Sequence, residues 1–168
     1  MGHCIQAIVT TSDIAESLRT IYPQLPGVKA PQGYVILPVD GEFIDDVTEA
    51  RLSQSTGTFI LPPEAFMLLT ETFHSLLRDL SRFGPLAYIE TDYFGGVGAQ
   101  GAAVYSGREV VMELRWRNFG PVNQALKLIG VKRRLLGDRF SALGLYKYRL
   151  NEDLIDAAAS DRHEHHDK

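Results

Sequence analysis

The sequence predicts a single α+β domain, built as a mainly antiparallel sheet with helices packed on one face. Three observations support this class. The 168 residues fall in the size range of one domain. Residues 87–93 and 110–116 alternate apolar and polar side chains, the period of half-buried strands. Apolar residues at three- and four-residue steps over 63–83 predict a long amphipathic helix. We expect the domain to span residues 1–160 and residues 161–168 to form a disordered tail.

The N-terminal third is expected to begin with a strand and a helix. Residues 4–9 form an apolar run typical of a buried strand, so we expect Cys4 to be largely buried and unpaired. A helix follows in which Ile14, Leu18 and Ile21 share one face, and Pro23 ends it.

The next segments alternate between strands and an acidic stretch. Residues 34–39 and 58–61 are expected to be strands. The segment 40–49 carries five acidic residues and no basic one. Its spacing does not match a calcium loop, so we interpret it as a surface loop or short helix.

The helix expected over 63–83 has Pro63 in its first turn, and Gly84 and Pro85 stop it. Its apolar face is expected to be the main contact with the core. That face comprises Phe66, Leu69, Phe73, Leu76, Leu77, Leu80 and Phe83. The opposite side is polar, and we expect His74 to be an exposed residue of that side.

The second half of the chain is expected to pair its strands as hairpins. Ser106 and Gly107 are suited to a two-residue turn between residues 102–105 and the strand 110–116. A helix is expected from Pro121 to about residue 131, on the same face as the helix over 63–83. Residues 137–148 suggest a short closing strand, and a final helix is expected through Ala159.

A glycine-rich segment, residues 95–101, contains the spacing G-x-G-x-x-G at Gly96, Gly98 and Gly101. A dinucleotide site would need a long helix directly after it, but a strand follows, so no nucleotide cofactor is expected. We interpret the segment as a bulged turn between strands. The alternative is an exposed recognition loop whose contacts are Tyr93, Phe94 and Gln100.

Three carboxylates, Glu90, Asp92 and Glu113, lie on polar faces of neighbouring predicted strands. Converging carboxylates can bind a divalent metal or exchange protons. Arginines lie equally close in the sequence, so cross-strand ion pairs account for the set more simply. We therefore expect no metal site and no cofactor, and a small enzyme that uses the Gly95–Gly101 loop with these carboxylates remains the alternative.

Charge is distributed unevenly along the chain. The net charge is −4, yet residues 108–149 hold 10 Lys and Arg against 3 Asp and Glu. This basic segment lacks the interleaved aromatic residues of a single-strand platform, so nucleic acid is not an expected partner. The single cysteine fits a reducing cytoplasm. We find no run of ~20 apolar residues and expect no membrane association.

Residues 93–100, Tyr-Phe-Gly-Gly-Val-Gly-Ala-Gln, resemble a segment of a group of small bacterial proteins of uncharacterised activity. Residues 123–131 and 138–145 resemble the same group. Proteins of this size and type include immunity proteins, which neutralise a toxin by direct binding. The expected function is therefore non-catalytic protein binding in the bacterial cytoplasm, with a basic toxin domain as the partner. The expected contact residues are Asp45, Asp46, Tyr93, Phe94 and Gln100.

Overall fold

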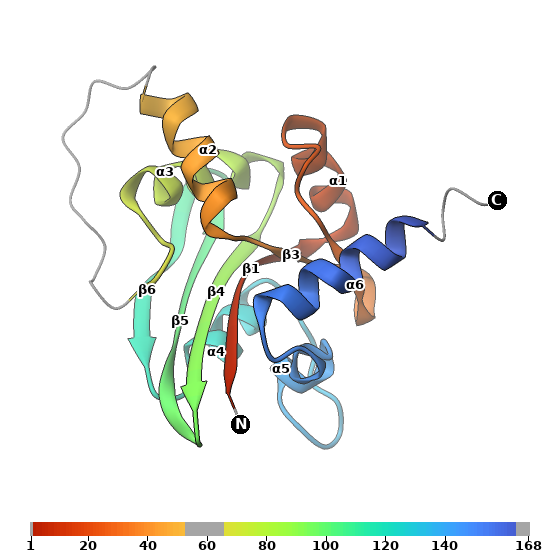
Figure 1. The fold of residues 1–168 in the computed structure, drawn as a ribbon. Helices are drawn as coiled ribbons and strands as arrows, with labels where there is room; N and C mark the ends of the chain where they lie inside the picture. Colours follow the sequence, from red (N-terminus) through yellow and green to blue (C-terminus); the bar gives the residue numbers. More distant parts are fainter. Residues whose placement is uncertain (1, 53–65, 164–168) are drawn as a thin grey trace.

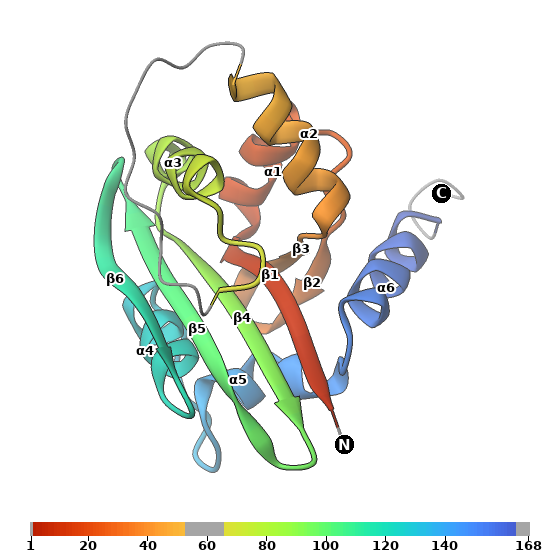
Figure 2. The same cartoon turned by 60° about the vertical axis from the view of Figure 1, so that its left-hand side comes forward.

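The computed structural model describes residues 2–52 and 66–163, in which one six-stranded antiparallel sheet lies between two layers of helices (Figures 1 and 2). The strands are β1 (His3–Thr11), β2 (Val28–Ala30), β3 (Tyr34–Pro38), β4 (Leu86–Phe94), β5 (Val97–Ser106) and β6 (Glu109–Arg117). Their order in the sheet is β2-β3-β1-β4-β5-β6. The predicted α+β class and antiparallel sheet are confirmed.

Six α-helices accompany the sheet in the described residues. They are α1 (Ser12–Ile21), α2 (Gly41–Leu52), α3 (Glu71–Leu80), α4 (Pro121–Leu128), α5 (Arg139–Ala142) and α6 (Asn151–His163). The acidic segment 40–49 therefore belongs mainly to a helix, α2. None of the described helices is long and apolar enough to cross a membrane.

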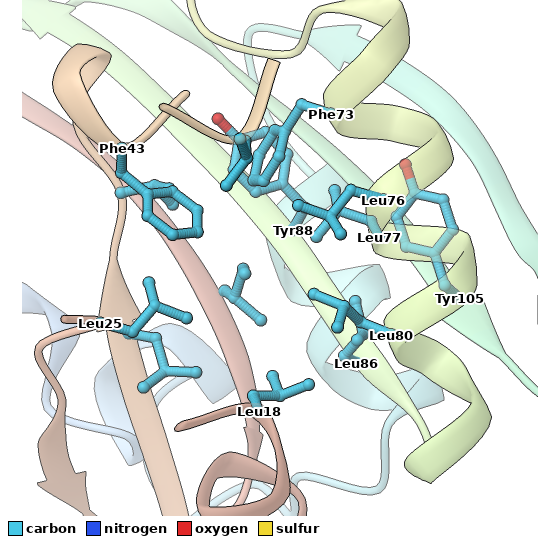
Figure 3. Packing of buried hydrophobic residues seen from close by; sticks show 14 of the residues in the cluster. Leu18, Leu25, Phe43, Phe73, Leu76, Leu77, Leu80, Leu86, Tyr88 and Tyr105 are labelled. Atoms are coloured by element: carbon cyan, nitrogen blue, oxygen red, sulfur yellow. The ribbon is translucent and has the colours of Figure 1, made fainter. Parts of the chain in front are cut away.

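The helices cover both faces of the sheet rather than the single face expected. Ile8 and Tyr88 belong to the apolar core that includes α1, α2 and α3 (Figure 3). Their neighbours Ala7 and Ile89 belong to a second core that includes α4 and α6. Because successive strand residues point to opposite faces, a central strand covered on both sides must be apolar at consecutive positions. The helices α3 and α4 therefore lie on opposite faces, each with its own core.

Helix α3 begins at Glu71, later than its apolar pattern predicts. The side chain of Thr70 accepts a hydrogen bond from the Phe73 backbone N–H at 3.2 Å and so caps the helix. Residues 66–70 are not helical, although Phe66 and Leu69 are buried. Their spacing matched a helix by coincidence, because an irregular segment can also bury every third residue. Residues 63–65 lie outside the described part of the chain.

Two side chains of this region differ from expectation. Phe83 is 39% exposed and does not join the core. His74 is half-buried rather than exposed, and its Nδ1 lies 2.8 Å from the Tyr105 hydroxyl. Burial lowers the pKa of His74, and the nearby Arg78 charge lowers it further. This histidine therefore helps to attach α3 to β5.

The closing strand expected over residues 137–148 is wrong. The segment forms α5 and a 3₁₀ turn, Leu145–Lys147. Asp138 caps α5 by accepting from the Ser141 backbone N–H at 2.8 Å. The following helix, α6, reaches His163 instead of ending at Ala159. The expected strand over 58–61 and residues 164–168 lie outside the described residues.

The first half of β1 has an unusual neighbour on one side. It pairs with β4 over residues 3–10, but with β3 only from Ala7 onward. Beside residues 4–6 lies the segment before α6, where the Cys4 N–H donates to the Arg149 carbonyl at 2.6 Å. The Gln6 N–H donates to the Asn151 side chain at 3.0 Å. Cys4 carries a free thiol, as expected, but it is half-buried rather than largely buried.

Candidate functional site

A small pocket of about 210 Å³ lies where β4 and β5 approach the first turns of α4 and α5. Its lining residues are His3, Thr91, Tyr93, Gln100, Phe119, Asn123, Asp138 and Phe140. Two of them, Tyr93 and Gln100, were expected contact residues. Thr91 and Gln100 are direct partners in the β4–β5 register, and Tyr93 follows Thr91 on the same face because strand side chains alternate.

Gln100 joins the sheet to α4. Its Nε2 donates to the Tyr93 hydroxyl oxygen at 2.8 Å, and its Oε1 accepts from the Val122 backbone N–H at 2.9 Å. The Tyr93 hydroxyl in turn donates to the Asn118 carbonyl. The Tyr93 ring stacks on Phe119, with centroids 6.4 Å apart. Gln100 and Tyr93 are thus held in fixed positions by bonds at both ends.

Asn123 and Asp138 form the other wall of the pocket. The Asn123 side-chain oxygen accepts from the backbone N–H groups of Arg139 and Phe140, at 2.9 and 3.1 Å. Its amide nitrogen donates to the Asp138 carboxylate at 2.9 Å. Partial burial opposes ionisation of Asp138, but hydrogen bonds from Ser141 and Asn123 outweigh it and hold the pKa of Asp138 below its usual value. Asp138 is therefore an anion at neutral pH.

His3, from β1, also lines the pocket. Its Nδ1 is 2.8 Å from the Thr91 hydroxyl, and its Nε2 is 3.5 Å from the Leu145 carbonyl. A carbonyl can only accept, which assigns the ring proton to Nε2 and makes Nδ1 the acceptor. Burial lowers the pKa of His3, although the bond to Leu145 opposes this. The neutral ring therefore has a partner at each nitrogen and packs against Phe140, with centroids 5.1 Å apart.

The remaining expected contact residues lie elsewhere. Phe94 stands at the end of β4, beside the pocket strands, and is 84% exposed. Asp45 and Asp46 are exposed on α2, which lies at the opposite end of the sheet from the β4–β5 turn (Figure 1). The five expected residues therefore divide into two surfaces.

The glycine-rich segment forms a tight hairpin without the expected bulge. Phe94 pairs with Val97, so Gly95 and Gly96 are the two turn residues, with φ of +60° and +83°. Gly98 is required for a different reason, because a Cβ atom there would lie 2.0 Å from the Asp92 carbonyl oxygen. This segment is therefore a turn between two strands, as predicted.

The three carboxylates of the enzyme alternative differ in environment. Asp92 and Glu113 are exposed, whereas Glu90 is completely buried. Glu90 accepts from the backbone N–H groups of Met67, Leu68 and Leu69 at 2.7–3.2 Å, and from the Tyr88 hydroxyl at 2.7 Å. The cross-strand ion pair expected for Glu90 is therefore wrong, since this carboxylate holds the segment before α3. Within residues 2–52 and 66–163, no three His, Cys, Asp or Glu side chains gather as a metal site.

Sequence reasoning missed six lining residues as site residues: His3, Thr91, Phe119, Asn123, Asp138 and Phe140. Three of these six, Asn123, Asp138 and Phe140, lie in the segments whose expected resemblance to a group of small bacterial proteins was the available signal. Their convergence on Tyr93 and Gln100 depends on the fold. No protein-family model matches the chain, no curated protein matches it in sequence, and no solved structure matches it.

Proposed function

We propose that the protein is a non-catalytic binding protein of the immunity type, which neutralises a cognate toxin by direct contact. We further propose that the pocket and the adjoining β4–β5 turn form its contact surface. The observation that carries the proposal is the convergence of Tyr93, Gln100, Asn123 and Asp138 on one pocket. These side chains are held by hydrogen bonds to one another and to backbone groups, so their positions are fixed before a partner arrives.

Exposed apolar side chains adjoin this pocket. Phe119, which lines it, is 76% exposed, and Phe94 and Val97 at the β4–β5 turn are 84% and 77% exposed. Large exposed apolar groups near a rigid polar pocket are typical of protein-binding surfaces. Aromatic anchors commonly carry much of the binding energy, so Phe94 and Phe119 are the expected anchors.

The hydrogen bonding of the pocket supports binding more than catalysis. A general base needs a nitrogen or oxygen that can reach the substrate proton. Both nitrogens of His3 already face protein partners, and Glu90 is enclosed by four donors. Each oxygen of Asp138 accepts a hydrogen bond, although its carboxylate keeps further lone pairs. These groups are suited to holding a shape and presenting one anion.

The charge of the chain favours a basic partner. The net charge is −4, and the exposed acids of α2, including Asp45 and Asp46, lie away from the pocket (Figure 1). Charges at a distance speed the encounter of oppositely charged proteins without contributing a contact. We therefore assign α2 to attraction of the partner and the pocket end to contact with it.

The test measures capture of the protein encoded by the adjacent reading frame, and protection of cells that express it. We expect Phe94→Ala and Phe119→Ala each to weaken capture about tenfold or more. Phe83→Ala is the matched control, because Phe83 is partly exposed and precedes the opposite end of β4. Full capture by both pocket-end variants, with loss of protection in Asp92→Asn and Glu113→Gln, would favour the enzyme alternative instead.

A further inference from the structure

The pocket combines one carboxylate with three aromatic rings. Asp138 is its anion, and Tyr93, Phe119 and Phe140 contribute the rings. His3 in the same pocket is neutral at pH 7, because burial disfavours its charged form. An anion beside aromatic faces is a favourable environment for an organic cation, which gains from both the charge and the ring quadrupoles.

We propose that the pocket receives one basic side chain of the partner protein, arginine in preference to lysine. The inference rests on the proposed function and names the group that the partner inserts. A guanidinium group is planar, donates two parallel hydrogen bonds to a carboxylate and stacks on aromatic rings, whereas an ammonium group is a compact point charge. The volume of about 210 Å³ is below the roughly 300–1,000 Å³ of small-molecule sites, and it suits a single side chain.

Asp138 retains the capacity to bind such a group. A carboxylate offers about four lone-pair positions, and the contacts with Ser141 and Asn123 engage one on each oxygen. The side chain is exposed at the edge of the pocket, so its remaining lone pairs are accessible. The bond from Asn123 also fixes the orientation of the carboxylate, which lowers the entropic cost of a two-point contact.

Cations near the pocket oppose this binding and lie outside its lining. Arg139 follows Asp138 directly, and its Nε donates to the Val131 carbonyl at 2.9 Å. Arg117 is the nearest in the sheet register, since it pairs with Gln100. Its side chain is exposed and can extend into solvent. Arg115 donates to the Gln124 side chain at 2.9 Å. Lys132 lies beyond the last turn of α4, where its backbone bonds with Gln32. A direct contact with Asp138 is stronger than these screened repulsions.

The test titrates the ¹⁵N-labelled full chain with N-acetyl-arginine N-methylamide and follows the side-chain amide signals of Gln100 and Asn123 by NMR. The citrulline analogue has the same shape without the charge, and the glutamate analogue has the opposite charge. We expect saturable shifts with the arginine compound, weaker binding of the lysine compound, and at least about tenfold weaker binding of the citrulline compound. Equal affinity for arginine and citrulline, or tighter binding of glutamate, would overturn the inference.

Four variants locate the charge that matters. Asp138→Asn should weaken arginine binding about tenfold while keeping a residue that caps helices well. Asp45→Asn removes the same charge from α2 and should leave the affinity unchanged. Arg117→Gln should strengthen binding, because it removes a repulsion. The double variant Asn123→Asp with Asp138→Asn exchanges the two side chains. It keeps every hydrogen bond of the pair and moves the negative charge to position 123, so it should restore arginine binding.

The variants can contradict the inference in two ways. Equal losses in Asp138→Asn and Asp45→Asn would show a general charge effect without a pocket. If the exchange variant folds but binds arginine no better than Asp138→Asn does, a carboxylate in the pocket is not the group that binds arginine. Neither result depends on a partner protein. If arginine binds but the adjacent gene product is not captured, the pocket chemistry stands and the proposed function fails.

Discussion

Two carboxylates, one on each side of the sheet, accept hydrogen bonds from backbone N–H groups, and they differ in how much hydrogen-bonding capacity remains for a ligand. Glu90 fixes residues 67–69 against the face covered by α1, α2 and α3, and none of its surface is exposed. Asp138 caps α5 on the other face and remains exposed. A buried carboxylate must use its bonding capacity internally, whereas an exposed one can offer it to a ligand. Glu90 is therefore structural and Asp138 is available for function.

The largest expected effect concerns the packing around the enclosed carboxylate. The Phe73 ring packs edge-on against Tyr88, with centroids 5.2 Å apart, and Tyr88 donates to Glu90. Phe73→Ala should lower the free energy of unfolding by about 3–5 kcal/mol, because it leaves a cavity in the core. Urea denaturation measures the change. Phe83→Ala is the exposed control and should cost less than about 1 kcal/mol; a similar loss in both variants would refute the assigned core face.

The second-largest effect is expected for Glu90→Gln, which should lower the free energy of unfolding by about 3 kcal/mol. The substitution replaces one acceptor oxygen by an amide group that faces backbone donors, and it leaves buried N–H groups unsatisfied. Glu113→Gln, an exposed carboxylate changed in the same way, should stay within about 0.5 kcal/mol. The Glu90 variant therefore reports on folding, and it cannot serve as a test of catalysis. Equal stability of the two variants would place Glu90 outside the core.

Lowering the pH should remove the stability that the ionised Asp138 side chain contributes to the fold. Its pKa in the folded protein lies below the ordinary value of 3.8, so the unfolded chain takes up the proton first. The stability contributed by the ionised group is present above that value and is lost as pH falls through the folded pKa. In Asp138→Asn, the free energy of unfolding should therefore decline less below about pH 4 than it does in the wild type. This difference should be smaller than the loss of unfolding free energy in Glu90→Gln. Identical declines in the wild type and the variant would contradict this.

The smallest effect on stability is expected for α2. Replacing Asp45 and Asp46 by Lys should change the free energy of unfolding by less than about 0.5 kcal/mol, because both side chains are exposed. The same change should slow association with a basic partner and weaken the dependence of that rate on salt. Stopped-flow association at two ionic strengths measures both. A change in dissociation rate alone would instead place α2 inside the interface.

Local patterns predicted the parts of the fold that depend on local physics. The alternation over 110–116 identified β6, where period two reflects greater burial of one strand face. The alternation over 87–93 identified β4 as a strand, but residues 86–91 are buried on both faces rather than half-buried. The apolar run of residues 4–9 identified β1. Consecutive apolar residues also indicate that helices cover both faces of a strand, but we interpreted the run only as a sign that β1 is buried. The start of α3 was missed because Phe66 and Leu69 are buried without being helical. Their position depends on Glu90, which is distant in sequence.

The pocket was predicted in part for a similar reason. Tyr93 and Gln100 were identified because they flank a glycine-rich turn between strands. His3 was not identified as a site residue, because nothing local connects it with residues 91, 140 and 145. These groups meet because β1 lies beside β4 and because α5 returns to the start of α4. Convergence of this kind is a property of topology, which a pattern along one segment does not contain.

The position of β1 has a consequence for how the chain folds during synthesis. β1 becomes an inner strand of the sheet, although it is synthesised before its partner β4, which begins more than 80 residues later. The hydrogen bonds from Cys4 and Gln6 to Arg149 and Asn151 join residues that are 145 positions apart. Contacts of such long sequence separation slow folding and leave apolar strands unpaired in the meantime. We therefore expect β1 to complete its pairing only after residue 151 has been synthesised.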